Sequence, residues 1–460
     1  MLSRRKTLIV GTTDDYIQWI RQLHPKTCLF LTDPAVRCRE NGSGNSTDEI
    51  LWHLADYEGA RTALDQYLRR HNCRLDGVAC FDCESMELAA VIAHAYGLPY
   101  PTVQAVNNCR NKYLTKFIWK YHDLRTPRTR QLTTVGDAIA ALDEFGGICV
   151  LKPATGSGSE LIFSCADRDQ CRTSFLSIQD GLRKRSDSRL YHPGDVNPGM
   201  ILAEEFIDGE EYSCDFIVEK NQARIIRLTR KIISDHGPFG TAFAYLVPTE
   251  LPPEISSSGF NRILFRSAFA LGIDRAICML DFKIDNGRIV FLELAPRPGG
   301  DCIPFLLRHG YGLDILLLLV DFSRQRPLKK YLPRFPFTYL LQKEGPGPGP
   351  FIGLRLHAAQ SGELKTIDTT YLLEDPRVKK IHFIRKPGHR VTLPPDDYAS
   401  WLLGHVIFIP VSGIDAAAQC YDLSTKIRVS ILPTDCINEA GNNTFDQKSG
   451  DTTTTRALPI

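Results

Sequence analysis

The chain has 460 residues, of which 43% are hydrophobic and 23% charged, enough for two or three domains with buried cores. Its formal net charge of +2 argues against a nucleic-acid-binding protein, which would carry a broad basic surface. The 14 cysteines follow no disulfide framework, so we expect mostly reduced thiols and a cytoplasmic location. The apolar runs at 7–11 and 315–320 are too short to cross a bilayer, and no membrane partner is expected.

Apolar runs alternate with helical patterns through the first part of the chain. The runs KTLIVG and GVACFD are typical of buried strands, and MELAAVIAHAYGLP is typical of an amphipathic helix that ends at glycine before proline. This alternation predicts a parallel α/β domain over residues 1–106. Cys80 and Cys83 form a C-x-x-C pair. Because no second pair lies at zinc-binding spacing, a strand end leading into a helix is the favoured interpretation.

The middle of the chain, residues 107–334, mixes helices with strands. A helix is expected over NKYLTKFIWKYHDL, and the strand ICVLKP leads into the glycine-rich turn ATGSGSE. Strands dominate from Met200, and a helix follows near 257–272. Two further strands are joined by the turn D-N-G at 285–287, which favours an antiparallel hairpin. Together these patterns predict a mixed α/β and α+β architecture.

The last third of the chain is divided by the segment GPGPGP, residues 345–350, which marks a conformational break. Short strands and a helix around it predict a small α+β domain, with the bounds 335–432. Residues 433–460 are polar and aperiodic, so we expect a disordered tail there.

Five groups of residues in the middle of the chain carry side chains suited to phosphate and metal chemistry. In chain order they are Lys112; Lys152 with the loop Gly156-Ser157-Gly158-Ser159; Glu204-Glu205-Phe206-Ile207 with Glu211; Lys231; and Asp281 with Glu293 and Arg297-Pro298-Gly299-Gly300. Each group alone has an ordinary explanation, such as a surface lysine, a loop or a solvent-facing pair of carboxylates. Their combination in this order and in these strand contexts favours a functional site.

Each group has a physical use. A loop rich in Gly and Ser exposes backbone N–H groups that can hold phosphate oxygens, and lysines offset the charge of a triphosphate. Asp281 and Glu293 are expected on adjacent strands of the hairpin, where both can point to one face. Carboxylates that share a face repel unless a cation joins them, and Mg²⁺ prefers oxygen ligands together with substrate phosphates. The planar fork of Arg297 suits a carboxylate or an acyl phosphate.

With these motifs the sequence resembles the ATP-grasp superfamily, specifically the carboxylate–amine ligase branch that includes bacterial L-amino-acid ligases. The resemblance is most specific in FLELAPRPGGD, and then in LKPATGSGS and EEFIDGEEYS. It implies an ATP-grasp fold over residues 107–334. The flanking regions would then be an N-terminal parallel α/β (pre-ATP-grasp) domain and a small C-terminal α+β domain.

The resemblance also implies a role for each residue, with ATP as cosubstrate and Mg²⁺, or alternatively Mn²⁺, as the metal. Catalysis is implied for Arg297, which would hold the substrate carboxylate, and for Lys231, which would meet the γ-phosphate. The metal would be carried by Asp281 and Glu293. The nucleotide-binding residues would be Lys112 and Lys152 for the phosphates, Gly156, Ser157, Gly158 and Ser159 for a loop that closes over them, Glu204, Phe206 and Ile207 for adenine, and Glu211 for ribose.

Two positions depart from the pattern of the superfamily. Ala295 stands where an Asn often follows the metal-binding Glu by two residues, so one ligand for a second metal ion is missing. Asp281 replaces the longer Glu that is often found at its position. These departures leave open whether one or two metal ions bind.

The resulting hypothesis is an ATP-dependent carbon–nitrogen ligase. A substrate carboxylate attacks the γ-phosphate of ATP and gives an acyl phosphate and ADP, and an amine then displaces phosphate to form an amide. The partners are a small carboxylic acid, such as an amino acid, and an amine. The sequence does not determine the oligomeric state, although the resemblance is compatible with a homodimer. One alternative is a carboxylase or ligase of the same fold that acts on bicarbonate or another small acid. The other alternative is a nucleotide-binding protein without catalysis.

The sequence does not identify the two substrates, because their side chains are selected by the shape of a pocket built from loops. His236, Phe239 and Phe243 follow Lys231 and are candidates for lining that pocket. Ordinary loop packing is the alternative for each of them.

Overall fold

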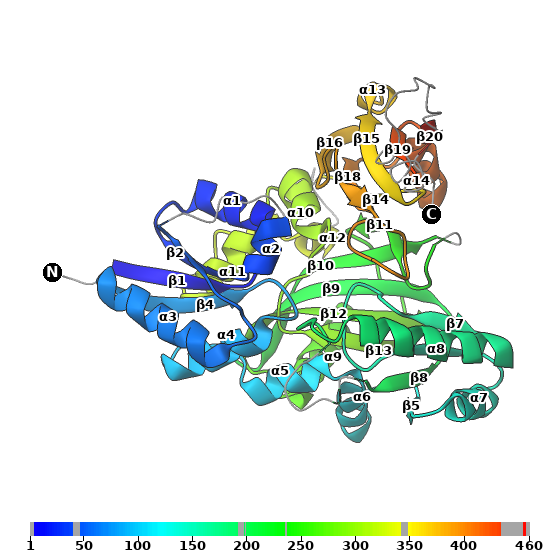
Figure 1. Cartoon of the computed structure of the whole chain (residues 1–460), viewed down its shortest axis with the longest axis horizontal. Coiled ribbons are helices and arrows are strands. Elements are labelled where there is room, and N and C mark those ends of the chain that lie inside the picture. The colour runs from blue at the N-terminus through cyan, green and yellow to red at the C-terminus, as the bar shows by residue number, and fades with distance from the viewer. Residues whose placement is uncertain are drawn as a thin grey trace, which may run out of the picture.

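The computed structural model describes residues 4–39, 47–191, 197, 199–234, 237–341, 348–433 and 454–456. Within these residues the strands form four sheets, with helices packed against them (Figure 1). One sheet is parallel and lies near the N-terminus, and the largest sheet has eight strands. The model therefore confirms the predicted mixture of α/β and α+β structure.

The N-terminal sheet is parallel and has the strand order β3-β2-β1-β4. The last three residues of the inner strand β1 are apolar because helices cover both faces of the sheet. Ile9 belongs to a core shared with α1 and α11, whereas Leu8 and Val10 belong to a core shared with α3 and α4. The elements of this region are β1 (Arg4–Val10), α1 (Asp14–Leu23), β2 (Cys28–Thr32), α2 (Pro34–Arg39), β3 (Glu49–Leu51), α3 (Tyr57–Arg70), β4 (Cys73–Cys80) and α4 (Met86–Ala95).

Two helices lead from this sheet into a small antiparallel sheet with the order β5-β8-β6-β7. Helices α7 and α8 pack on it around a core that includes Leu142, Leu151 and Ile178. The expected helix near residue 111 begins at Lys112, after Asn111, whose side chain accepts hydrogen bonds from two backbone N–H groups of the first turn. The elements are α5 (Val103–Arg110), α6 (Lys112–Tyr121), β5 (Thr129–Leu132), α7 (Val135–Glu144), β6 (Cys149–Pro153), β7 (Phe163–Cys165), α8 (Arg168–Lys184) and β8 (Ile201–Glu205).

The largest sheet runs in the order β13-β12-β9-β10-β11-β14-β18-β16. The predicted hairpin is present at its edge, where Asn286 and Gly287 both have positive φ, as the tight turn between β12 and β13 requires. The expected helix near 257–272 is α9, which packs on β9 and β10. The elements are β9 (Glu210–Glu219), β10 (Gln222–Ile233), β11 (Ala242–Val247), α9 (Ser257–Ala270), β12 (Ala276–Asp285) and β13 (Arg288–Ala295).

The last part of the chain extends this same sheet. β14 pairs with β11, and β18 and β16 follow it, so hydrogen bonding is continuous across the segment that contains GPGPGP. Of the predicted break at 345–350, residues 345–347 lie outside the described part of the chain. The elements are α10 (Ile303–Tyr311), α11 (Ile315–Ser323), the short 3-10 helix Leu332–Arg334, α12 (Pro336–Leu341), β14 (Phe351–His357), β15 (Gly362–Asp368), α13 (Thr370–Leu373), β16 (Val378–Phe383), β17 (Arg390–Val391), β18 (Leu402–Phe408), α14 (Ala416–Ser424) and β19 (Arg428–Leu432).

The predicted disordered tail, residues 433–460, is described at residue 433 and at Thr454–Arg456, and its other residues lie outside the described part of the chain. Thr454–Arg456 forms β20, which pairs with β19 in the sheet β17-β15-β19-β20. At these three residues the expectation of disorder was wrong. A short segment rich in Thr can add to the free edge of a strand, which composition alone does not predict.

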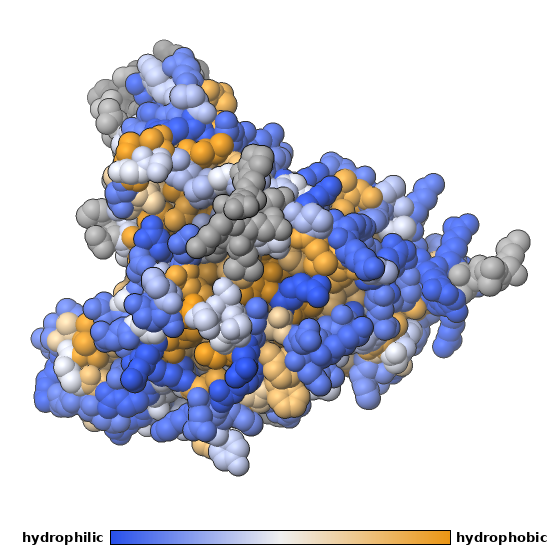
Figure 2. Space-filling model, turned by 180° about the vertical axis from the view of Figure 1, so that it is seen from behind, coloured by the Kyte–Doolittle hydropathy of each residue, from blue (hydrophilic) through white to orange (hydrophobic). Residues whose placement is uncertain are grey.

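No single helix among the described residues is long and apolar enough to span a membrane. Helices α10 and α11 are long and apolar enough for a membrane span only when taken together, and the chain bends by 102° between them. Seen from behind, the surface is mostly hydrophilic, and apolar side chains gather toward its centre (Figure 2). The cysteines whose side chains are described are free thiols, in agreement with the prediction.

A buried ion pair ties two neighbouring strands of the large sheet. Arg227 on β10 donates from Nε to Asp215 Oδ2 on β9 over 2.8 Å, and both side chains are almost fully buried. We expect Asp215→Ala to lower the free energy of unfolding by about 3–5 kcal/mol, because it leaves an unpaired buried guanidinium. Urea denaturation measures this change. As control, Asp180→Ala removes the exposed partner of Arg183 and should cost far less, because solvent screens that pair; equal losses in both variants would contradict the prediction.

Candidate functional site

A cavity with about 1030 Å³ of empty space, its open mouth included, lies between the small antiparallel sheet and the edge of the large sheet that contains β12 and β13. It brings together every predicted nucleotide- and metal-binding residue. These are Lys112, Lys152, Gly156, Ser157, Gly158, Ser159, Glu204, Phe206, Ile207, Glu211, Asp281 and Glu293, together with Lys231. Residues separated by 181 positions in the chain (112 to 293) thus line one space. Lys152 and Glu293 share one cleft, as the hypothesis requires.

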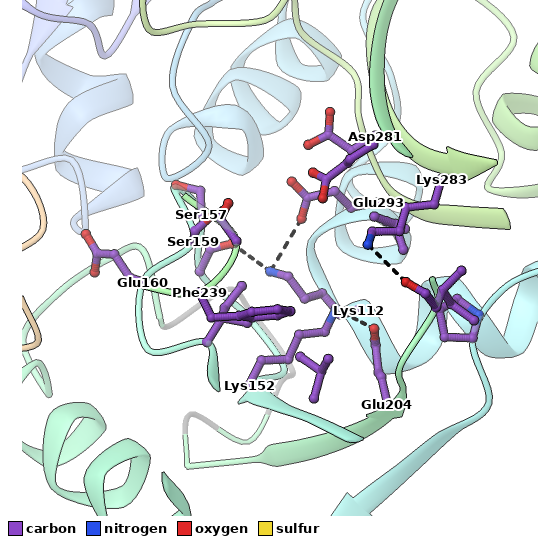
Figure 3. A pocket seen from close by; sticks show the side chains of 18 of the residues that line it. Lys112, Lys152, Ser157, Ser159, Glu160, Glu204, Phe239, Asp281, Lys283 and Glu293 are labelled. Carbon is purple, nitrogen blue, oxygen red and sulfur yellow. Dashed lines mark hydrogen bonds and ion pairs between the residues drawn. The ribbon is translucent and has the colours of Figure 1, made fainter. Parts of the chain in front are cut away.

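Lys112 links the two walls of the cavity. It stands at the start of α6, and its Nζ donates to the carbonyl oxygen of Gly156 over 2.8 Å. The same Nζ lies 3.8 Å from Glu293 Oε2. Figure 3 shows its ammonium group pointing toward the carboxylates of Glu293 and Asp281. Burial lowers the pKa of Lys112, and the charge of Glu293 opposes this effect.

Glu204 is held between two ammonium groups at the floor of the cavity. Its Oε2 lies 2.6 Å from Lys152 Nζ, and its Oε1 lies 3.2 Å from Lys116 Nζ. Burial alone would raise the pKa of Glu204, but Lys116 and Lys152 hold it below its usual value. Glu204 is therefore an ionised carboxylate inside the protein, and its charge fixes the position of Lys152.

Lys116 was not among the predicted site residues. Its side chain is 3% exposed, and its Nζ also donates to the carbonyl oxygen of Leu292 on β13. Lys116 thereby connects α6 to both walls of the cavity. A signal was available in the sequence, because Lys116 follows Lys112 by four residues and so lies on the same helix face.

The glycine-rich loop has the backbone conformation that its sequence predicts. Gly156 and Gly158 have φ of +110° and +72°, values that side chains disfavour, and Ser159 follows with φ of +60°. A Cβ atom at Gly156 would also lie 2.9 Å from the ring of Tyr191. The hydroxyl of Ser159 donates to the carbonyl oxygen of Gly240 over 2.8 Å, so the loop is tied to the segment after β10.

The acidic pair lies on the hairpin as expected. Asp281 on β12 is directly opposite Glu293 on β13, and Figure 3 shows both carboxylates facing the cavity. Lys231 Nζ lies 2.7 Å from Asp281 Oδ2 and 2.7 Å from Glu211 Oε1. Burial and the neighbouring carboxylates raise the pKa of Asp281, although Lys231 opposes them. The second oxygen, Oδ1, is buried and has no hydrogen-bond partner among the described residues.

Phe206 and Ile207 form an apolar strip beside the glycine-rich loop. Lys283, another residue that was not predicted, donates from Nζ to the carbonyl oxygen of Ile207 over 2.9 Å and lies 5.4 Å from the ring centre of Phe206. Phe239 is 6.3 Å from Phe206, ring centre to ring centre, and lines the same cavity. The cavity therefore has an apolar section next to its charged section.

Phe243 and His236 were the other two residues expected to line the substrate pocket. Phe243 is 2% exposed and belongs to the core beneath β14 and β18, where it packs against Tyr421. It is a packing residue, which was the stated alternative. His236 lies outside the described residues.

Arg297 stands apart from the other predicted residues, since it is not among those that line the cavity. It follows β13 by two residues, and its Nε and Nη2 both donate to the sulfur of Cys83, over 3.2 Å and 3.0 Å. Nη1 donates to the carbonyl oxygen of Pro298 over 2.8 Å. Gly299, in the same segment, donates its backbone N–H to Asp215 Oδ1 over 2.9 Å. Arg297 is thus held next to the cavity by the N-terminal region and by the large sheet.

We expect the ammonium group of Lys116 to lose its proton within a pH range that NMR can follow. Burial lowers its pKa to about 8, although Glu204 opposes the shift. The pKa of a lysine side chain in the unfolded chain is about 10.4. Between about pH 8 and pH 10 the unfolded chain therefore binds more protons here than the folded one, and the contribution of Lys116 to stability rises with pH. We expect its ε-methylene NMR signal to titrate near pH 8.

The variant Lys116→Arg keeps the charge and should remove that titration, which assigns the signal. Its free energy of unfolding, relative to that of the unmodified protein, should fall as the pH rises through the same window. A Lys116 signal that stays constant up to pH 10 would contradict the prediction.

Comparison with known proteins supports the same fold. Residues 146–304 match the model of the ATP-grasp domain. Among curated relatives, human carnosine synthase 1 is 26% identical over 287 residues, which are 59% of this chain and 33% of that protein. D-alanine–D-alanine ligase of Delftia acidovorans is 26% identical over 215 residues, 44% of this chain and 60% of that protein. The chain thus spans about a third of the length of the first relative and somewhat under two thirds of the second.

Solved structures extend the likeness to nearly the whole chain. The L-amino acid ligase from Bacillus licheniformis has a TM-score of 0.70 at 19% identity, with 94% of this chain and 99% of that chain covered. Biotin carboxylase from Campylobacter jejuni has a TM-score of 0.62 at 13% identity, with coverages of 94% and 96%. Residues 146–304 of this chain thus form an ATP-grasp domain, and the chain is similar in sequence to ligases that contain such a domain and in fold to an L-amino acid ligase.

Proposed function

We propose that the chain is an ATP-dependent carboxylate–amine ligase, which joins an amino acid or another small carboxylic acid to an amine through an acyl phosphate. The observation that carries the proposal is the convergence, in one cavity, of Lys112, Lys152 and the glycine-rich loop with the carboxylates of Asp281 and Glu293. The relatives of the chain include a synthase and ligases, and these relatives support the same class of reaction.

The cavity suits a nucleoside triphosphate in its charge and in its shape. The apolar section at Phe206 and Ile207 fits a flat base, and Glu211, which lines the same cavity, would accept hydrogen bonds from ribose hydroxyls. Lys112 and Lys152 fit the phosphates, and backbone N–H groups of residues 156–159 can hold their oxygens. Each ammonium group now rests on a carboxylate or a carbonyl oxygen, so a polyanion can take over contacts that are already in place.

A divalent metal also fits the residues present. Asp281 offers a buried oxygen without a partner, and Glu293 faces it from the paired strand. Mg²⁺ commonly takes one or two carboxylates and completes its coordination with phosphates and water. Among the described residues no group of three or more His, Cys, Asp or Glu side chains could hold a metal ion, which agrees with a site that depends on the nucleotide. Ala295 adds no ligand to it.

The chemical steps follow from these contacts. A carboxylate oxygen attacks the γ-phosphorus of ATP and the bond to the bridging oxygen breaks, giving an acyl phosphate and ADP. The amine then attacks the acyl carbon, phosphate leaves with the C–O bond electrons, and the nitrogen loses a proton. Mg²⁺ would neutralise the developing charge on the phosphates. Lys231 would stabilise the transferred phosphoryl group and Arg297 the carboxylate, in a site closed by the glycine-rich loop against water.

One alternative within the same fold is the activation of bicarbonate or another small acid. It is favoured by the structural likeness to biotin carboxylase and to carboxyaminoimidazole ribonucleotide synthase from Aspergillus clavatus, which has a TM-score of 0.62 at 14% identity and coverages of 92% and 98%. Release of ADP that depends on bicarbonate, and not on an amino acid, would favour this alternative. Binding of ATP without turnover on any acid would instead favour a non-catalytic nucleotide-binding protein.

The proposed reaction can be tested by ADP and phosphate release with ATP, Mg²⁺ and a panel of the twenty L-amino acids. We expect Lys152→Ala and Arg297→Ala to lower turnover by at least about 10²-fold, because each removes a group that stabilises developing charge. The exposed Lys184→Ala serves as the control and should retain full activity. Unchanged turnover in both site variants would contradict the site assignment.

The metal site can be tested without turnover, by counting bound Mn²⁺ by electron paramagnetic resonance in the presence of a non-hydrolysable ATP analogue. We expect Glu293→Gln to weaken Mn²⁺ binding by more than about tenfold, because the amide removes one negative charge and one ligand oxygen. Glu144→Gln changes an exposed carboxylate and is the matched control. Equal Mn²⁺ affinities in the two variants, or turnover that survives a chelator, would rule out the proposed metal site.

A further inference from the structure

The C-x-x-C pair, Cys80 and Cys83, begins at the last residue of β4 and has no part in the proposed nucleotide site. Its two cysteines also differ in their surroundings. Cys80 is 1% exposed, and its sulfur donates to the carbonyl oxygen of Asp82 over 3.2 Å. Cys83 is half-buried, and its sulfur accepts two hydrogen bonds from Arg297.

The contact with Cys83 determines which edge of the guanidinium group remains available. A guanidinium has five N–H groups in one plane. One on Nε and one on Nη2 are directed to Cys83 Sγ, and one on Nη1 is directed to the carbonyl oxygen of Pro298. The two N–H groups that remain are one on Nη1 and one on Nη2. A pair of donors on these two nitrogens can bind the two oxygens of a carboxylate.

Both partners in this contact are held by their own surroundings. The carboxylate of Asp82 accepts the backbone N–H of Ser85 over 2.7 Å and so fixes the turn that carries Cys83. Gly11 allows this turn to approach β1, because a Cβ atom there would lie 2.1 Å from Asp82 Oδ2. On the other side, the bond from Gly299 to Asp215 fixes the backbone next to Arg297. The sulfur therefore meets the guanidinium in a defined geometry.

We propose that Cys83 is a positioning residue, which occupies the Nε edge of Arg297 and leaves the Nη1–Nη2 end of the guanidinium to bind the carboxylate of the acid substrate. This inference rests on the proposed role of Arg297 in binding that acid. The N-terminal region then contributes to recognition of the acid through the orientation of Arg297. Loss of the sulfur acceptor would free the Nε edge and allow Arg297 to adopt other orientations.

The first test needs no substrate. Phenylglyoxal modifies accessible arginines, and peptide mass spectrometry gives its rate at Arg297. We expect Cys83→Ala to raise this rate about fivefold, because sulfur is a weak acceptor and its two bonds to Arg297 together count as about one typical net hydrogen bond. Cys83→Ser keeps an acceptor and should lie between Cys83→Ala and the unmodified protein. The control Cys73→Ala removes another half-buried thiol, one that contacts the carbonyl oxygen of His71, and should leave the rate unchanged.

The second test uses the L-amino acid that supports the greatest ADP release. Cys83→Ala should raise the KM for that acid about fivefold while the KM for ATP stays unchanged, and Cys83→Ser should recover part of the loss. Equal phenylglyoxal rates in Cys83→Ala and Cys73→Ala would overturn the proposal, as would parallel increases in both KM values. If Cys83→Ala does not fold, the comparison of Cys83→Ser with Cys73→Ala decides. If the unmodified protein turns over neither an amino acid nor another small carboxylic acid, the proposed function fails, while the phenylglyoxal rates still decide the role of Cys83.

Discussion

The structure depends on the mutual compensation of charges that are buried between its two central sheets. Lys152 is paired with Glu204, and Lys231 is paired with Asp281. A charge taken out of water is costly unless an opposite charge or several hydrogen bonds replace the water. Each of these groups is therefore held at a defined place by its partner. Because of the same pairing, a polyanion and a divalent cation can enter the cavity together and keep its charge balanced.

Helix α6 keeps the two walls of the cavity facing one another. Lys112 donates to the glycine-rich loop on one wall and lies near Glu293 on the other. One turn later, Lys116 pairs with Glu204 and donates to the carbonyl oxygen of Leu292. Two lysines, four positions apart on one helix face, thus join β8, β13 and the loop after β6. A rotation of α6 would break these contacts together, so the position of this helix and the width of the cavity are coupled.

The nucleotide site was largely predictable from the sequence because each of its parts is local. The turn at Asn286 and Gly287 specifies the hairpin, and the hairpin places Asp281 opposite Glu293. The glycine pattern specifies the loop. Their meeting in one cavity followed from the family resemblance, since spacing in the chain does not determine which sheets face each other. Lys116 was missed because its role depends on burial against Glu204, although its helical phase relative to Lys112 was visible.

Long-range pairing explains the features that the sequence did not predict. β14 pairs with β11 and so continues the same sheet, although the sequence between them predicts a conformational break. A strand can pair with any free strand edge that offers matching hydrogen-bonding groups. α11 packs on the N-terminal sheet although it follows the hairpin in the chain. Neither contact has a sequence signature, since both depend on the apolar faces of elements that are distant in the chain.

The segment after β13 shows how these long-range contacts bear on substrate recognition. Cys83 from the N-terminal region accepts from Arg297, and Asp215 in the large sheet accepts from Gly299. Asp301, with φ of +59°, accepts from His405 over 2.8 Å and pairs with Arg355 over 2.7 Å, both on strands of the C-terminal part. Three regions thus position the segment that is proposed to bind the acid, whereas the residues proposed to bind the nucleotide all lie between 112 and 293. Substitutions in the first and last parts of the chain can therefore change which acid fits and leave the nucleotide cavity intact.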